Sequence, residues 1–228
     1  KAIEMGIDKE GFCSVIMEGR GIPAKGAFPG SFSYGNDAVE TVSYDPEEAK
    51  KLLEESGWTD TDGDGYVDKD GQKLTINWLT YPTRLEQPKL AEYAQATLKE
   101  IGIDVSVNNT SDHRTYAENG EFDVYVSSLT TAPTGDPEYF FSSTVTGSKN
   151  YGNYQNDEVT KLTEQLHQTF DTDERGKLAV ELQQKILDDD AYFFVSHLNM
   201  GIVTKANVTG MAAHPCDYYE ITADLDVQ

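Results

Sequence analysis

A chain of 228 residues is long enough for one large domain or two small ones, and its 38% of hydrophobic residues can fill a core, which excludes global disorder. The net charge of −22, from 40 acidic and 18 basic side chains, repels nucleic-acid phosphates and anionic lipid headgroups. Composition and charge therefore argue against a nucleic-acid-binding protein and against docking on a membrane surface.

The two cysteines, Cys13 and Cys216, lie far apart in the sequence and match no metal-ligand spacing, so we expect them to stay unbonded. No apolar run has the length needed to cross a membrane. The chain opens on Lys1 inside a helical pattern, without an initiator methionine or a signal peptide. We interpret it as a segment of a longer protein.

The first elements are two helices separated by a long loop. A helix is predicted to begin at Asp8 and to end before Gly21. Residues 21–43 are rich in Gly, Pro and Ser and are predicted to form an ordered loop. A second helix is expected at 46–56, because Asp45 can cap it and a proline occupies its first position.

A strand–helix–strand pattern follows. Residues 74–79 alternate apolar and polar side chains, residues 86–101 carry an apolar stripe at helical spacing, and residues 103–107 alternate again. Such a βαβ unit predicts a parallel pair of strands. A short helix at 112–119 and a third strand at 122–126 come next.

The last part of the chain is predicted to be mostly helical. Residues 129–155 are rich in loop residues, and amphipathic helices are expected at 156–170 and 173–188. Residues 192–195 are apolar and predict a buried strand. Together these elements predict an α/β fold, a single lobe over residues 1–228 with a mixed sheet and flanking helices.

Residues 60–68 carry oxygen ligands with the spacing of a Ca²⁺-binding loop. Carboxylates occupy loop positions 1, 3, 5 and 9, and a glycine at position 6 allows the tight turn. The predicted ligands are Asp60, Asp62, Asp64, the carbonyl of Tyr66 and Asp68. Gly71 replaces the bidentate glutamate of position 12, so an acidic turn without a metal is the alternative interpretation.

No catalytic residue is predicted. The four histidines form no close metal-binding pair, and the chain has no phosphate-binding loop, serine elbow or dinucleotide fingerprint. His214 lies next to Cys216 across a proline, but neighbouring side chains rarely face each other and no third group is evident. The sequence therefore offers little support for catalysis.

Several short motifs follow one another along nearly the whole chain. They are Ala2–Lys9, Gly21–Ala24, Tyr44–Leu53 with Gly57 and Trp58, Gly120–Asp123, Gly135–Pro137, Asn153–Glu158 and Asp173–Arg175. Their order resembles that of the family 5 extracellular solute-binding proteins, the peptide/nickel type that feeds ABC importers. The string from Tyr44 to Trp58, with the acidic loop that follows it, is the most specific part of this resemblance.

The resemblance implies a fold like the type II periplasmic binding proteins, in which two hinged lobes trap a solute between them. This chain resembles the second, ligand-gripping lobe without the first. Members work at the extracellular face of the cytoplasmic membrane or in the periplasm, often lipid-anchored, and deliver the solute to an ABC permease. We expect a monomer with no required cofactor, since Ca²⁺ is not a general requirement of the family.

In members of this family the loops corresponding to Tyr81–Arg84 and Leu129–Asp136 face the cleft. The candidate solute-binding residues are Tyr81, Arg84, Thr130, Thr131 and Asp136. Tyr81 can contact a peptide and Arg84 can pair with a carboxylate, whereas the two threonines can meet backbone groups. Tyr81 is otherwise a half-buried loop aromatic, and Asp136 is otherwise a helix cap before a proline.

The nature of the solute stays open between two main classes. A small peptide is the first expectation, because peptides dominate the family. A nickel or other metal chelate is the alternative, although chelate-binding members tend to carry a tryptophan near Thr131 and dipeptide-binding members an arginine in place of Tyr81. An extracellular hydrolase or a Ca²⁺-dependent adhesion module would require a function outside the family.

Overall fold

The computed structural model describes residues 1–213 and 221–228. Cys216 and His214 lie outside the described residues. That Cys13 and Cys216 stay unbonded therefore remains a prediction. Among the described residues, no helix has the length and apolar character needed to cross a membrane.

A parallel three-stranded sheet carries the predicted βαβ unit. Strand β4 (Thr75–Thr80) lies in the centre, with β5 (Asp104–Asn109) on one side and β6 (Val124–Tyr125) on the other. The β4–β5 register runs from Thr75 opposite Asp104 to Thr80 opposite Asn109, and β6 is also parallel to β4. The predicted parallel pair is therefore confirmed, and the third strand is shorter than predicted.

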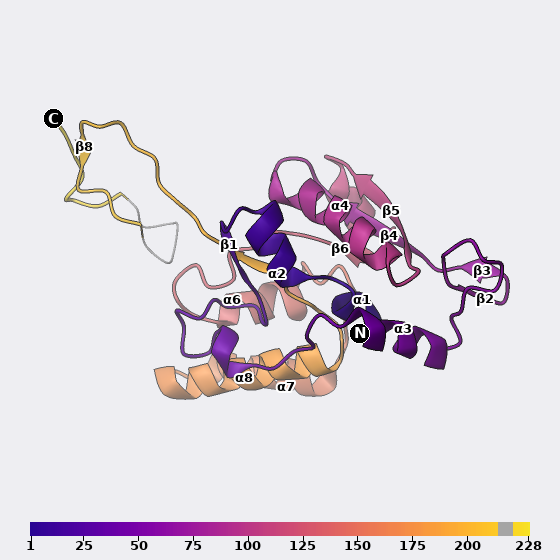
Figure 1. Cartoon of the computed structure of the whole chain (residues 1–228). Coiled ribbons are helices and arrows are strands. Elements are labelled where there is room, and N and C mark those ends of the chain that lie inside the picture. The colour runs from indigo at the N-terminus through magenta and orange to yellow at the C-terminus, as the bar shows by residue number, and fades with distance from the viewer. Residues whose placement is uncertain (214–220) are drawn as a thin grey trace.

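The first of two hydrophobic cores lies around this sheet. Helix α4 (Glu86–Lys99) packs on β4 and β5 (Figure 1) and buries its apolar stripe, as the sequence predicts. The core also takes side chains from α1 (Ala2–Met5), the π-helical turn Phe12–Ile16, which follows the short helix α2 (Lys9–Gly11), and α3 (Pro46–Glu55). Trp78, at the centre of β4, is fully buried in it.

Helix α3 begins as its sequence requires. The Asp45 side chain accepts a hydrogen bond from the Glu48 amide at 2.9 Å, and Pro46 occupies the first turn, where its missing amide proton costs nothing. A small antiparallel pair, β2 (Asp68–Lys69) with β3 (Gln72–Lys73), joins the acidic loop after α3 to the sheet.

The second core is helical and lies below the sheet in Figure 1. It is formed by α6 (Glu138–Phe140), the π-helical turn Phe141–Val145, α7 (Asp157–Gln168), α8 (Thr172–Asp188) and buried residues of 27–34. The helices at 138–145 lie inside the segment that was predicted to be mostly loop. They form because Phe140 and Phe141 are buried against Phe28, which supplies the tertiary contact that a short helix needs.

An extended segment at 192–195 connects the two cores, and its prediction as a strand is wrong. Tyr192 and Phe194 pack against the helical core, while Phe193 and Val195 pack against the sheet core. Side chains do alternate between the two sides of this segment, but each side packs against a different core and not against a neighbouring strand. Strand pairing begins only at β7 (Ser196–Leu198), which is antiparallel to β1 (Gly21–Pro23).

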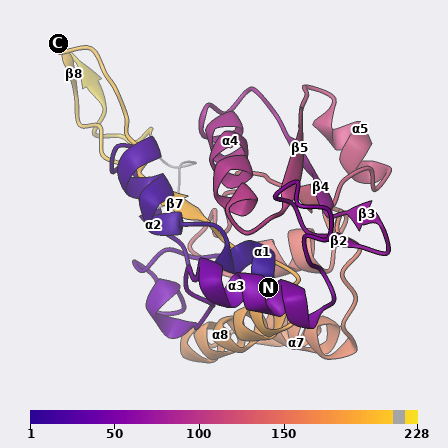
Figure 2. The ribbon, with the colours of Figure 1, turned by 45° about the vertical axis from the view of Figure 1, so that its right-hand side comes forward.

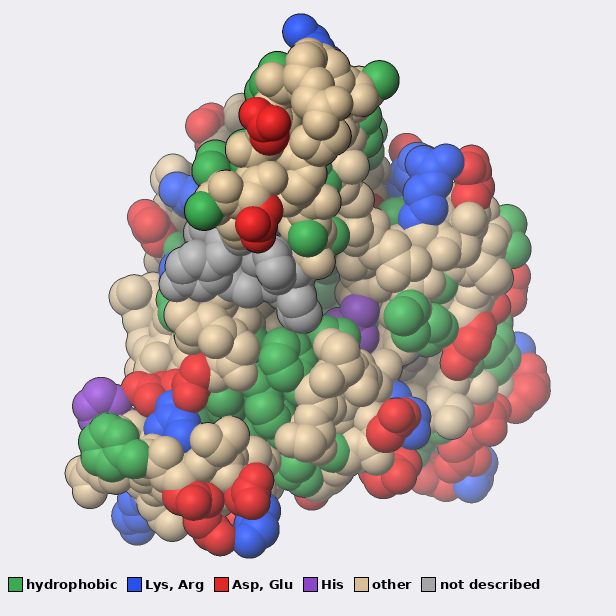
Figure 3. All heavy atoms as spheres, turned by 90° about the vertical axis from the view of Figure 1, so that its left-hand side faces the viewer, with side chains coloured by type: hydrophobic (Ala, Val, Ile, Leu, Met, Phe, Trp, Pro, Cys, Tyr) green, Lys and Arg blue, Asp and Glu red, His purple; other side chains and the backbone are tan. Residues whose placement is uncertain are grey.

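The other described elements are small. Asn36–Ala38 forms a 3-10 turn, α5 (His113–Glu118) follows β5, and β8 (Val208–Thr209) pairs with β9 (Asp226–Val227). The β8–β9 pair lies on an arm that projects away from the two cores (Figures 1 and 2). Hydrophobic side chains are exposed across the face from which the arm projects (Figure 3), and on the arm itself Met200 and Val203 are exposed.

Candidate functional site

The carboxyl ends of the three parallel strands meet at one edge of the sheet. The chain leaves β4 to form β5 on one side and then returns to form β6 on the other side, so the direction of the connections reverses at β4. A crevice outside the carboxyl ends of the strands at such a reversal is the usual ligand site of open α/β sheets. Three segments follow these ends, namely 81–85, 110–112 and 126–137.

Tyr81, directly after β4, is buried. Its side chain is 7% exposed, its ring is stacked on that of His113 with centroids 4.2 Å apart, and its hydroxyl accepts a hydrogen bond from the Ser128 amide at 3.1 Å. Tyr81 therefore joins the segment after β4 to the start of α5 and to the segment after β6. This geometry favours the interpretation as a buried loop aromatic over stacking on a peptide.

His113 extends this aromatic cluster toward β6. Its Nδ1 lies 2.7 Å from the hydroxyl oxygen of Tyr125. Burial lowers the pKa of His113, and the positive charge of Arg114 lowers it further, so the imidazole is neutral at pH 7. Burial also raises the pKa of the Tyr125 phenol. Sequence analysis missed this pair, because neither residue belongs to a motif.

A polar network surrounds Ser128 behind the cluster. The Ser128 hydroxyl donates to Glu86 at 2.9 Å and accepts from the Gln87 side-chain amide at 2.7 Å. The buried Thr80 hydroxyl is 3.4 Å from the Gln87 carbonyl oxygen. These bonds fix the segment after β6 against the first turn of α4, and sequence analysis missed them all.

Two arginines at this edge have no acidic partner among the described residues. Arg84 follows β4 and Arg114 lies in α5; both are exposed, and neither forms an ion pair in the part of the chain that the structure describes. Glu86, the nearest acid in sequence to Arg84, bonds Ser128 instead. Unpaired arginines stand out in a chain with 40 acidic side chains.

Exposed apolar side chains accompany these cations. Leu85 is 81% exposed beside Arg84, and Leu129 is 46% exposed at the start of the segment after β6. The edge therefore offers positive charge next to apolar surface.

Thr130 and Thr131 differ in their surroundings. Thr130 is exposed, whereas the half-buried Thr131 donates its hydroxyl to the Ala27 carbonyl at 2.9 Å. Of the two predicted contacts to backbone groups, only that of Thr130 is open to a solute.

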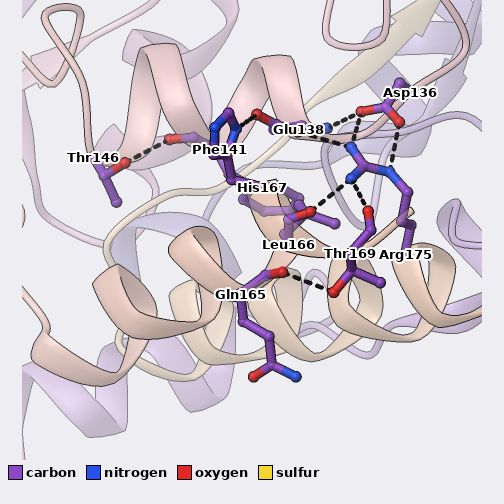
Figure 4. Close-up of polar contacts among 9 residues, drawn as sticks. All are labelled: Asp136, Glu138, Phe141, Thr146, Gln165, Leu166, His167, Thr169 and Arg175. Carbon is purple, nitrogen blue, oxygen red and sulfur yellow. Dashed lines mark hydrogen bonds and ion pairs between the residues drawn. The ribbon is translucent and has the colours of Figure 1, made fainter. Parts of the chain in front are cut away.

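Asp136 is occupied by protein groups. It accepts a hydrogen bond from the Glu138 amide at 2.9 Å, and the Arg175 guanidinium binds both of its carboxylate oxygens at 2.6 and 2.8 Å (Figure 4). Burial alone would raise the pKa of Asp136, but the bonds from Arg175 and the amide hold it below its usual value. The N-cap of α6 is Pro137, so Asp136 lies one residue before the predicted cap position, and its bonds to the Glu138 amide and Arg175 occupy both of its oxygens.

The acidic loop gathers three of its predicted ligands. Oxygen atoms of Asp60, Asp62 and Asp68 lie within 4.8 Å of one another. Asp64 is turned away and forms an ion pair with Lys73 at 2.6 Å, which lowers its pKa. Lys73 also lies over the Tyr66 ring, 4.2 Å from its centroid.

Two hollows lie outside the predicted site residues at the sheet edge. One of about 510 Å³ is beside α5, and one of about 320 Å³ is between α4 and β5. Neither is lined by Tyr81, Arg84 or the segment after β6. We place the candidate site at the carboxyl edge because buried polar bonds, aromatic stacking and unpaired charge converge there.

Comparison with known proteins decides the family. The profile of the bacterial extracellular solute-binding proteins, family 5 middle, matches residues 1–152. This chain belongs to that family. The resemblance and the α/β fold of the type II periplasmic binding proteins, both predicted from the sequence, are confirmed, and the family consists of solute-binding proteins.

Relatives of this family 5 chain include peptide-binding and nickel-binding proteins. This chain is 31% identical to the oligopeptide-binding protein AppA of Bacillus subtilis, over 97% of this chain and 42% of the relative. It is 27% identical to the nickel-binding periplasmic protein of Escherichia coli, over 94% of this chain and 42% of the relative. The chain thus spans about two fifths of the length of the curated relatives it matches.

Solved structures agree with the fold of the family 5 chain. AppA from Bacillus subtilis, in complex with a nonapeptide, superposes with a TM-score of 0.78 at 26% identity, covering 94% of this chain and 44% of that one. NikA from Staphylococcus aureus, in complex with Ni(L-His)2, superposes with a TM-score of 0.79 at 24% identity, covering 100% and 47%. The second likeness shows the fold alone.

Proposed function

We propose that this chain is the ligand-gripping lobe of a two-lobed solute-binding protein that captures a peptide-like solute and delivers it to an ABC permease. The protein would act outside the cytoplasmic membrane as a monomer, lipid-anchored in its full length, and would bind and release solute by hinge closure without chemistry. Support comes from family membership and from relatives that are named for binding oligopeptides and dipeptides.

One observation at the sheet edge carries the proposal. Arg84 and Arg114 expose positive charge without an acidic partner among the described residues, at the strand ends where such folds bind ligands. A guanidinium binds a carboxylate through two parallel hydrogen bonds. The exposed Leu85 can cover an apolar part of the same solute. A peptide, with a terminal carboxylate and apolar side chains, matches both features.

The experiment uses the full-length protein and the variant Arg84→Ala. Peptides that co-purify with the protein from cells would be identified by native mass spectrometry and then titrated by calorimetry. Loss of a charge-assisted hydrogen bond should cost about 1.5–3 kcal/mol, roughly ten- to a hundredfold in affinity. Lys89→Ala, an exposed change in α4, is the matched control and should leave the affinity unchanged. Equal affinities of the wild type and Arg84→Ala would reject Arg84 as a contact.

A metal chelate is the second candidate, because two nickel-binding proteins are 26–27% identical to this chain. Carboxylate groups of such a chelate could form ion pairs with Arg84 and Arg114. The two solutes are separated by elemental analysis of the purified full-length protein: nickel at about one equivalent, lost with the small-molecule fraction, would favour the chelate over the peptide.

A further inference from the structure

Arg175 is the most completely bonded polar side chain of the second core. It belongs to α8, its side chain is 13% exposed, and all of its N–H groups have acceptors (Figure 4). The guanidinium donates to both oxygens of Asp136 and to Glu138, and also to the carbonyls of Leu166 and Thr169 at 2.6 Å. A guanidinium this far out of water is tolerated only when its donors are satisfied in this way.

The acceptors belong to two different parts of the fold. Leu166 and Thr169 lie at the end of α7, where carbonyls lack the amide partner of a helix interior; the Leu166 carbonyl accepts only a 3.2 Å bond from the Thr169 amide besides that from Arg175. Asp136 and Glu138 lie where the segment after β6 enters α6. Arg175 therefore ties the end of this segment to the α7–α8 pair.

Two further bonds hold the same segment, residues 129–136, which we call the crossing segment. The Tyr34 hydroxyl donates to the Gly135 carbonyl at 2.7 Å, and Thr131 donates to Ala27. Ala132 is buried in the helical core. These contacts involve the later residues of the segment, whereas Leu129 and Thr130 at its start are exposed.

We propose that Arg175 is a positioning residue for solute binding. It fixes the crossing segment, and thereby the exposed Leu129 and Thr130, without touching the solute itself; this inference rests on the proposed function. Asp136 takes part as the partner of Arg175 and not as a contact to the solute. A site whose supporting contacts are removed loses the sub-ångström placement on which affinity depends.

The test begins with the full-length protein and no solute. Hydrogen exchange of the backbone amides of residues 129–138 is compared in the wild type, Arg175→Met and Lys177→Met. Methionine keeps the length and volume of the arginine but none of its donors, and Lys177 is an exposed residue of the same helix. We expect exchange at 129–138 to accelerate at least roughly tenfold in Arg175→Met, with β4 and β5 unchanged. Unchanged exchange in the crossing segment overturns the inference.

Binding is then measured by calorimetry with a synthetic nonapeptide, the class of solute bound by the Bacillus subtilis relative. Arg175→Met should weaken binding roughly three- to thirtyfold, and Arg175→Lys, which restores one charged bond to Asp136, should recover part of the loss. If Arg175 acted through packing alone, the methionine and lysine variants would bind the nonapeptide with equal affinity. If Arg175→Met does not fold, Asp136→Asn removes the charge and keeps an acceptor for the Glu138 amide, and it should weaken binding in the same direction.

A double-mutant comparison separates positioning from contact. Arg175→Met combined with Thr131→Val should be non-additive, because both changes release the same segment, whereas Arg175→Met with Arg84→Ala should be additive. If Arg84→Ala weakens nonapeptide binding and Arg175→Met does not, the inference fails and the proposed function stands. If the wild type does not bind the nonapeptide, peptide binding fails, and the exchange experiment alone decides whether Arg175 fixes the segment.

Discussion

The imidazole of His113 is stacked on the ring of Tyr81, with ring centroids 4.2 Å apart and planes inclined by 27°. The two residues follow β5 and β4, respectively, so this contact joins the segments at the carboxyl ends of neighbouring strands. The Tyr81 hydroxyl adds a third segment through the Ser128 amide. Contacts within the protein thus hold together the segments at the carboxyl edge of the sheet.

We predict that Tyr81→Phe lowers the free energy of unfolding. Phenylalanine keeps the stack on His113 but leaves the Ser128 amide without its acceptor, which costs about 1–3 kcal/mol for a part-buried group. The measurements are denaturant unfolding and calorimetry on the full-length protein. A loss of affinity without a loss of stability would restore Tyr81 as a direct contact.

Local sequence patterns predict the elements of this fold well because each depends on neighbours in the chain. Asp45 and Pro46 define the start of α3, and the stripe of α4 between two alternating strands predicts the βαβ unit. The family resemblance identified the two loops of the candidate site. Within those loops, residue type alone could not separate an exposed Thr130 from a Thr131 that bonds Ala27.

What the sequence could not predict depends on contacts between distant residues. Asp136 and Arg175 are 39 residues apart, and the Gln183 bond to Ala27 spans 156. The segment 192–195 is a similar case, because its alternation matches a strand equally well whether its two sides meet one sheet or two separate cores. Such contacts follow from the packing of elements that are distant in the chain, which no local pattern contains.

We predict that the free energy of unfolding falls in mild acid because of His197. Burial lowers its pKa from 6.5 to about 4, and its Nε2 lies 3.0 Å from the Asn36 side-chain oxygen. Because the folded-state pKa is lowered, the unfolded chain binds the proton more readily, so stability falls as the pH drops below about 6.5 and continues to fall until about 4.

Between pH 7 and 5 this difference amounts to roughly 2 kcal/mol. We expect His197→Gln, which cannot titrate, to lose less stability than the wild type over this interval, as measured by urea unfolding at each pH. His167→Gln is the comparison for an exposed histidine: His167 is 75% exposed, and its Nδ1 lies 2.7 Å from the Glu138 carboxylate. Parallel curves for the wild type and His197→Gln would contradict the prediction.

Gln183 is a polar residue whose replacement by an apolar one should destabilise the core. It is fully buried, accepts a hydrogen bond from the Ala27 amide at 3.1 Å and donates to the Tyr34 carbonyl at 2.7 Å. Gln183→Leu would leave both backbone groups buried without partners, at a cost of roughly 2–5 kcal/mol. Glu181→Leu, an exposed change in the same helix, should alter the free energy of unfolding by less than about 0.5 kcal/mol. Equal stabilities of the two variants would show that water satisfies the exposed groups.

The acidic loop provides the last prediction, that Ca²⁺ stabilises the protein. Asp60, Asp62 and Asp68 already converge, and binding to the folded state raises stability by mass action. Chelator should therefore lower the melting temperature, and Asp62→Ala should abolish the difference between chelator and added Ca²⁺.

The ion pair between Lys73 and Asp64 predicts which substitution should raise the affinity of the loop for Ca²⁺. Lys73 holds the Asp64 carboxylate at 2.6 Å and so competes with a cation for a ligand at loop position 5. Lys73→Met should release Asp64 and tighten Ca²⁺ binding, whereas Lys69→Met, in the adjacent strand, removes an equal charge without freeing a loop carboxylate. Both variants would be titrated with Ca²⁺ by calorimetry. Equal affinities would mean that Asp64 is not a ligand, and no heat of binding in any variant would leave the loop as an acidic turn whose carboxylates serve its own backbone amides.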